Sequence, residues 1–265
     1  MHHSLNYYAN LAHNILNSET QYLSNKTIIS ALFKAQVNLD FESIVKNRIT
    51  IIDSCYSTQM SKRLYGIDEL AETIAIYSDE DLKRQTSRFL NEPSNPSVIN
   101  SLFEKEYGID KSGRPFGKAI SLISKYIYFL NDGNFPIYDS LAIDSYKLLK
   151  KNNHIITKDT LNVKNYFGQM KQLNSDTNIN SFENLDNLLW LVGKLSKGSF
   201  GILMNKEKYL SLISSKGINS ELKNQENKKS LAKNEIIRDY IKANYKVSSM
   251  FSDNQKTFFE FVFGL

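Results

Sequence analysis

The sequence predicts a mainly α-helical protein, and three observations lead to that class. Apolar residues recur at intervals of three and four along most of the chain, as on the buried face of a helix. No region shows the clean alternation of apolar and polar residues that a half-buried strand has. Prolines stand only at 93, 96, 115 and 136, so long stretches are free of helix breakers.

The apolar spacing predicts helices along most of the chain. In chain order we expect them at 5–17, 25–35, 41–55, 60–76, 79–90, 97–107, 120–130, 139–151, 160–173, 184–195, 206–213, 233–244 and 256–263. Ser57 and Thr58 precede the fourth of these, where their side-chain oxygens can cap free backbone amides. Between 214 and 230 the periodicity gives way to polar residues, which predicts a surface linker. We therefore divide the chain into a helical domain, 1–205, and a C-terminal helical extension, 206–265.

Composition limits the class of protein. The chain has 265 residues, 41% of them apolar, which suffices for one large or two small cores. The single cysteine allows no intramolecular disulfide, and no apolar run approaches the roughly 20 residues of a membrane span. A net charge of +5 suits a nucleic-acid partner but also fits many other soluble proteins. We expect a cytoplasmic monomer whose C-terminal phenylalanines dock on the main body or on a second copy.

The segment from Gly117 to Ser145 is the most informative in the chain. Ile120, Ile123, Ile127 and Leu130 lie at helical spacing, which predicts a helix with a broad apolar face. Turn-forming residues follow at 131–134, and proline at 136 favours an extended backbone around it. The extended run ends in an aspartate at 139, where a side chain can cap the next helix.

The spacing predicts that a lysine approaches this aspartate. The five residues from Asn134 to Asp139 span at most about 17 Å, the rise of roughly eleven residues of helix. A chain that doubles back therefore brings Asp139 level with the front half of the preceding helix. Lys118 and Lys125 both belong to that half, and from the residues alone either could be the partner.

Four short motifs in this order resemble a known family. They are YSTQ at 56–59, SLISK at 121–125, PIYDS at 136–140 and LWLVGK at 189–194. Together they resemble the helix-hairpin-helix DNA glycosylase superfamily, most closely bacterial proteins with an 8-oxoguanine DNA glycosylase-like fold. The resemblance covers roughly residues 45–200. It implies a helix-hairpin-helix glycosylase-like helical fold and a double-stranded DNA partner.

The resemblance also implies roles for individual residues. Asp139 would stabilise the positive charge that develops on deoxyribose when a flipped-out base is released. The nucleophile would be water or a lysine, and the lysine could be Lys118, at the superfamily position, or Lys125, within the SLISK pattern. The implied base pocket comprises Tyr56, Tyr138 and Trp190. The implied DNA contacts are Ser57, Thr58, Gln59, Lys62, Arg63, Gly113, Arg114, Gly117 and Lys194.

The sequence departs from the superfamily in two places. The segment 111–117, KSGRPFG, stands where those enzymes carry a tight L-P-G-V-G hairpin, although Gly113 and Gly117 could serve the same turn. The iron–sulfur cluster of some relatives needs four cysteine thiolates, and Cys55 is alone. The histidines show no metal-ligand spacing, and no phosphate-binding glycine motif is present. We expect no metal and no cofactor.

Each singled-out residue also has a plain structural interpretation. Asp139, Ser57 and Thr58 could do no more than cap helices. Lysines on amphipathic helices are usually solvated, and a tryptophan among leucines, such as Trp190, is most often core. The competing function is therefore a catalytically inactive helical DNA-binding or interaction protein. If the chain is a glycosylase, its role could be base excision repair or defence against phages with modified DNA.

Overall fold

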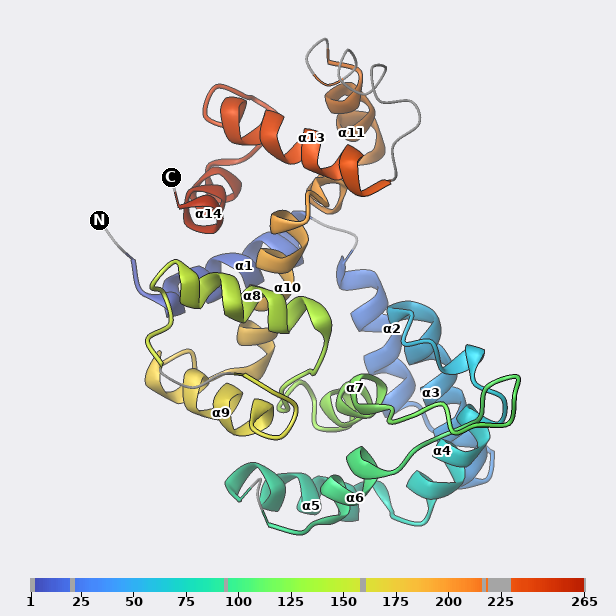
Figure 1. Cartoon of the computed structure of the whole chain (residues 1–265). Coiled ribbons are helices and arrows are strands. Elements are labelled where there is room, and N and C mark those ends of the chain that lie inside the picture. Colours follow the sequence, from blue (N-terminus) through green and yellow to red (C-terminus); the bar gives the residue numbers. More distant parts are fainter. Residues whose placement is uncertain are drawn as a thin grey trace.

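The computed structural model describes residues 3–19, 22–92, 95–157, 161–215, 218 and 230–264. It confirms the mainly helical class (Figure 1). Extended pairing in these residues is limited to three isolated antiparallel bridges. None of the described helices has both the length and the apolarity that crossing a membrane requires.

The helices follow one another through short connections. The first half of the chain contains α1 (Leu5–Glu19), α2 (Tyr22–Lys34), α3 (Phe41–Tyr56), α4 (Gly66–Ala75), α5 (Asp79–Asn91), α6 (Val98–Glu104) and α7 (Ile120–Leu130). The second half contains α8 (Ser140–Lys151), α9 (Tyr166–Asp176), α10 (Phe182–Ser196), α11 (Lys206–Ile213), α13 (Ser230–Asn244) and α14 (Asp253–Phe263). Two short 3-10 helices, η1 (Met60–Lys62) and η2 (Phe200–Leu203), lie between them.

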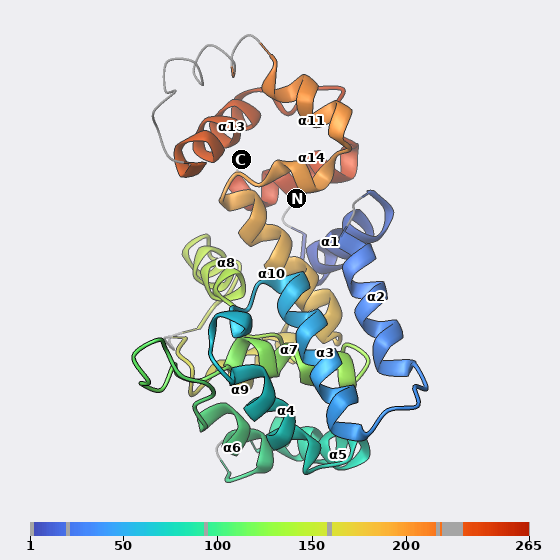
Figure 2. The same ribbon diagram turned by 90° about the vertical axis from the view of Figure 1, so that its right-hand side faces the viewer.

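Two helices form the centre of the body. The helix α10 packs against both α1 and α8 (Figures 1 and 2). The helix α7 is buried along nearly its whole length, since ten of its eleven residues are buried. It packs against α2, α3, α5 and α6. A polar side chain on α7 therefore lies in the interior unless it reaches a cavity.

The chain doubles back after α7 as the sequence predicts. The α7 helix ends at Leu130 and is capped by Asn131, and Gly133 takes a left-handed backbone conformation in the turn. The following extended residues return along α7, because the Tyr138 amide donates a hydrogen bond to Ser124 Oγ at 3.0 Å. Asp139 then caps α8 by accepting a hydrogen bond from the Ala142 amide at 2.8 Å. The predicted cap is confirmed.

The prediction of a helix at 60–76 is wrong for its first turn. Only 60–62 form a 3-10 turn there, and α4 begins at Gly66. Gln59 and Tyr65 adopt left-handed backbone conformations, which interrupt a regular helix. Leu64 pairs instead with Ile109 through two backbone hydrogen bonds. A tertiary contact far along the chain thus overrides the local preference for helix.

The helix predicted at 160–173 begins later than expected. Residues 158–160 lie outside the described part of the chain, and α9 begins at Tyr166. The preceding turn is held by the Asn162 side chain, which accepts hydrogen bonds from the amides of Lys164 and Asn165. An asparagine that bonds its own backbone in this way favours a turn over a helix.

Between α6 and α7 the chain forms an open hairpin rather than a tight turn. Glu106 pairs with Lys118 and Ile109 with Pro115, and the loop reverses around Gly113. Both Gly113 and Gly117 have positive φ angles, 80° and 118°, which suits glycine. Because this ladder extends to residue 118, α7 begins only at Ile120, and Lys118 precedes the helix.

The C-terminal extension docks on the main body. It lies at one end of the molecule, opposite α5 and α6 (Figure 2). The ring of Phe261 stacks on Tyr8 of α1 with centroids 3.8 Å apart, and Phe258 and Phe259 are fully buried. The linker predicted at 214–230 falls largely outside the described residues, although Ile218 is buried.

Gly198, at the end of α10, gives a test of this docking. Its φ is +76°, and a Cβ atom there would lie 2.1 Å from the Asn234 carbonyl oxygen in α13. Gly198→Ala is expected to lower the free energy of unfolding by about 1–3 kcal/mol for backbone strain alone. The backbone clash adds to that loss. Urea denaturation is the measurement.

Gly113→Ala is the matched control, because its φ is +80° and nothing lies within 4 Å of the added Cβ. It should lose only the strain energy. Equal losses in the two variants would contradict the close packing of α13 on the end of α10.

Candidate active site

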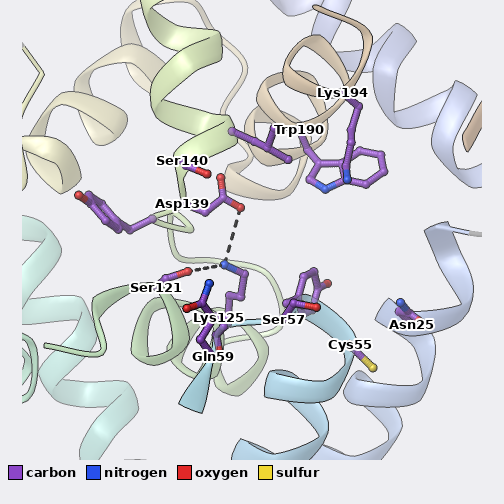
Figure 3. A pocket seen from close by; sticks show the side chains of 14 residues that line it. Asn25, Cys55, Ser57, Gln59, Ser121, Lys125, Asp139, Ser140, Trp190 and Lys194 are labelled. Carbon is purple, nitrogen blue, oxygen red and sulfur yellow. Dashed lines mark hydrogen bonds and ion pairs between the residues drawn. The ribbon is translucent and has the colours of Figure 1, made fainter. Parts of the chain in front are cut away.

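A cavity of about 640 Å³ opens where α3, α7, α8 and α10 meet (Figure 3). It brings together residues from all the motifs singled out in the sequence. Its lining comprises Asn25, Cys55, Tyr56, Ser57, Thr58, Gln59, Ser121, Lys125, Tyr138, Asp139, Ser140, Leu141, Trp190 and Lys194. Segments separated by more than a hundred residues therefore share one concave site.

Lys125 and Asp139 face one another across this cavity. The Nζ atom of Lys125 lies 3.7 Å from Oδ2 of Asp139 and 2.8 Å from Oγ of Ser121 (Figure 3). The lysine side chain is only 3% exposed, whereas that of the aspartate is 23% exposed. An amine and a carboxylate thus meet at the wall of a solvent-connected cavity.

Burial changes the protonation of Lys125. Desolvation lowers the pKa of the amine, while the negative charges of Asp139 and Asp186 act in the opposite direction. Desolvation prevails, because water no longer stabilises the ammonium form. The neutral amine, which is the nucleophilic form, therefore costs less free energy to form at Lys125 than at an exposed lysine.

Asp139 is held at the first turn of α8. One of its oxygens accepts the Ala142 amide, and the other faces Lys125. The side chain therefore lies at the positive end of the α8 dipole. Asp139 thus caps α8 and faces the cavity at the same time, so the first turn of α8 fixes the position of its carboxylate.

Aromatic side chains form part of the cavity wall. Tyr56, Tyr138 and Trp190 all line it, and each is half-buried. The structure therefore places Trp190 at the cavity surface rather than fully in the core. Lys194 lies 5.2 Å from the Trp190 ring centre, and Lys125 lies 5.6 Å from that of Tyr56. Burial raises the pKa of the Tyr56 hydroxyl well above its usual range, so this wall remains uncharged.

The YSTQ segment forms a strained loop at the cavity rim. Ser57 and Gln59 have left-handed backbone conformations, with φ of 51° and 66°. Such conformations cost about 1–3 kcal/mol each for residues other than glycine. Neither Ser57 nor Thr58 caps a following helix, so that expectation was wrong: Ser57 ends α3, and the Thr58 hydroxyl donates to Asp53 at 2.6 Å.

The Asp53 side chain holds this loop in place through hydrogen bonds. Its carboxylate also accepts the amides of Met60 and Ser61, each at 2.9 Å. Burial acts to raise the pKa of Asp53, but the hydrogen bonds from Thr58, Ser61 and Met60 outweigh it, and the pKa is lowered. One buried carboxylate therefore fixes the loop that presents the exposed Gln59 to the cavity.

Asp53→Ala is expected to lower the free energy of unfolding by about 1–3 kcal/mol, because it leaves buried amide donors unpaired. The loss should depend on pH. The folded-state pKa is lowered, so the stabilisation is present above pH 4 and disappears as the pH falls through the folded-state pKa. Urea denaturation between pH 3 and pH 7 measures this.

Asp239→Ala, at an exposed position on α13, is the control and should change stability little at any pH. A loss for Asp53→Ala that is the same at pH 3 and at pH 7 would contradict the role of the ionised Asp53.

Several residues predicted to touch DNA or substrate lie elsewhere. Lys118 is outside the cavity, and its amine pairs with Glu104. The Arg63 guanidinium donates to the carbonyl oxygens of Tyr107, Gly117 and Lys118, so its role is to hold the hairpin to the start of α4. Arg114 is 79% exposed and pairs with Asp110 within the hairpin. The hairpin glycines do not line the cavity, and Lys62 is exposed next to the strained loop.

Sequence reasoning missed several residues of the site. Ser121 stands one turn before Lys125 and accepts its hydrogen bond, a spacing visible in SLISK. Asn25 and Cys55 carry no motif and reach the cavity through the packing of α2 and α3. Asp186, one turn before Trp190 on α10, is buried close to the two central charges. Four-residue spacing from Trp190 could have pointed to it.

Comparison with protein-family models, with curated proteins and with solved structures returns no match. Among the described residues, no group of three or more His, Cys, Asp or Glu side chains could hold a metal ion. The site must therefore be interpreted from its own chemistry. That chemistry is a desolvated amine, a capped carboxylate, aromatic walls and a strained polar rim.

Proposed function

We propose that the protein is a DNA glycosylase that takes a damaged or modified base out of duplex DNA and cleaves its N-glycosidic bond. One observation supports this most directly: the Lys125 amine lies 3.7 Å from the Asp139 carboxylate in a cavity with aromatic walls. The resemblance of four motifs to the helix-hairpin-helix glycosylases supports it independently, because the motifs converge on this cavity. The assignment of this chain to the helix-hairpin-helix fold is part of the same proposal.

Substrate binding begins with extrusion of one nucleotide, which costs a few kcal/mol of stacking and pairing. Tyr56, Tyr138 and Trp190 offer faces on which the extruded base can stack. Gln59 is exposed at the rim, and the strained loop holds it in place to fill the gap left in the duplex. Lys62 and Lys194 supply positive charge for the phosphates on either side.

Bond cleavage develops positive charge on the deoxyribose. The Asp139 carboxylate stabilises this charge from a fixed position, and it needs no reorganisation because α8 already orients it. Lys125, whose pKa is lowered by desolvation, attacks the anomeric carbon as the free amine and forms a Schiff base, with strand cleavage as a second activity. Attack by water in place of the amine would give base release alone.

A panel of duplex oligonucleotides tests the function. Each duplex carries one 8-oxoguanine, uracil, alkylated base or glucosylated base, and alkaline strand scission reports base release. We expect release from one class at least, with unmodified duplex of the same sequence left intact. Release from none of them, together with salt-sensitive duplex binding, would support the inactive DNA-binding alternative instead.

A further inference from the structure

The Asp186 carboxylate is buried without a bonding partner. It lies on α10, is 9% exposed, and makes no hydrogen bond or ion pair with any residue that the structure describes. A carboxylate with this little exposure to water and no bonding partner is costly in its ionised form, so its presence calls for an explanation from function. Stability alone would favour an apolar residue at this position.

The position of Asp186 relates it to the cavity. Trp190 and Lys194 follow it at intervals of four residues, and residues at this spacing share one face of a helix. Both of them line the cavity, and Asp186 lies on the same side of α10 about 6 Å further along the axis, buried behind the lining rather than part of it. Its charge acts on Lys125 and on Asp139, which places it beside the central pair.

The surroundings of Asp186 allow it to exchange a proton near neutral pH. The titratable groups that face it are Lys26 of α2, Tyr56 of α3, Lys125 and Tyr128 of α7, Asp139 before α8, Tyr166 of α9 and Glu183 of α10. Burial has the largest effect on its pKa. The two lysines counteract burial, Asp139 and Glu183 add to it, and the pKa of Asp186 rises to about 7. Lys26 is itself engaged with Glu183 at 2.9 Å.

We propose that Asp186 is the proton acceptor for Lys125, so that the site releases the free amine without relying on bulk solvent. This inference rests on the lysine chemistry of the proposed function. Asp139 remains the group that faces the sugar cation, while Asp186 takes up and returns the proton. The transfer passes through water, since no hydrogen bond joins Asp186 to Lys125.

The proton balance closes around a Schiff-base cycle. Lys125 ammonium gives one proton to the Asp186 carboxylate, and the neutral amine attacks the aldehyde carbon of an abasic sugar to form a carbinolamine. The proton returns from Asp186 to the departing hydroxyl group, which leaves as water, and a protonated Schiff base remains. When the sugar still carries its base, the departing base takes the proton instead.

Borohydride trapping on a duplex with a single abasic site tests this step apart from base recognition. The trapping rate of the wild type should rise with pH, with a midpoint near 7. Asp186→Asn keeps the shape of the side chain but accepts no proton, so trapping at pH 7 should fall by about 100-fold and recover at higher pH. Asp186→Glu, which restores a carboxylate, should restore the midpoint near neutrality.

If Asp186 acted only through its charge, Asp186→Asn should increase the trapping rate rather than lower it. The charge of Asp186 favours the ammonium form of Lys125, so its removal alone would lower the pKa of that amine and speed trapping. The proposal would be overturned if the Asp186→Asn variant formed the trapped adduct as fast as the wild type, or faster. Asp144→Asn, at an exposed position on α8 where the carboxylate pairs with Lys197 away from the cavity, is the matched control and should change the rate little.

Stability provides the folding check. The folded-state pKa of Asp186 is raised above the ordinary value near 4, so the wild type loses stability as the pH rises from 4 through 7. Asp186→Asn should therefore unfold at a higher temperature than the wild type at pH 8, and the difference should vanish below pH 4. Lower stability of this variant at pH 8 would also count against the assignment.

If the wild type gave no trapped adduct, the mechanism with lysine as nucleophile would be ruled out, and so would the role of Asp186. Base release measured by alkaline scission would still be possible through attack by water. The two failures are therefore distinguishable.

Discussion

Asp139→Asn should release base about 10²–10³-fold more slowly than the wild type, because it removes fixed negative charge from beside the reacting sugar. Asparagine caps helices as well as aspartate does, so the start of α8 should remain intact. The substitution thus separates the cap from the charge. Single-turnover base release on the best duplex of the panel is the measurement. Duplex affinity should be unchanged or slightly higher, since a negative charge near the phosphates is lost.

Asp144→Asn is the matched control for this prediction. Asp144 belongs to the same helix but is exposed and pairs with Lys197 at 2.7 Å, away from the cavity lining. It should release base at the wild-type rate. If Asp139→Asn also kept that rate, Asp139 would be a helix cap only, and the proposed mechanism would have to be abandoned.

Lys125→Met should abolish the covalent adduct trapped by borohydride on abasic duplex. Methionine fills a similar volume without an amine, so neither Schiff base nor strand cleavage through it can form. Asp139 keeps its hydrogen bond to the Ala142 amide and its access to solvent, so the fold should tolerate the change. Gel-resolved trapping with sodium borohydride provides the readout.

Lys118→Met is the matched control, since both lysines match superfamily patterns. Its amine is exposed and pairs with Glu104, and trapping should proceed at the wild-type rate. Loss of the adduct in Lys118→Met, with retention in Lys125→Met, would reverse the assignment. Base release by Lys125→Met without trapping in any variant would indicate attack by water.

Much of the path from α7 to α8 could be predicted from the sequence because its determinants are local. The apolar spacing of α7, the turn-forming residues 131–134 and the proline at 136 act within a few residues of their own positions. The same holds for Asp139, whose capping oxygen needs only the backbone amide three residues ahead. The approach of a lysine to Asp139 followed from chain length alone.

The choice between Lys118 and Lys125 could not be predicted in this way. It depends on where α7 begins, and the hairpin before it is set by the pairing of Leu64 with Ile109 and by Arg63. These contacts join residues about 45 to 55 positions apart. The first turn of the predicted helix at 60–76 was lost for the same reason, and Arg63 is occupied in the hairpin rather than free for DNA.

The sequence by itself determined the helical class, the doubling back of the chain after α7, and the presence of an aspartate at the start of α8. Tertiary structure decided which amine meets that aspartate, how the strained loop is supported by Asp53, and how deeply Asp186 is buried. The physical reason is the range of each effect. Backbone preferences are fixed by neighbouring residues, whereas desolvation and charge–charge distances depend on helices that come together from across the whole chain.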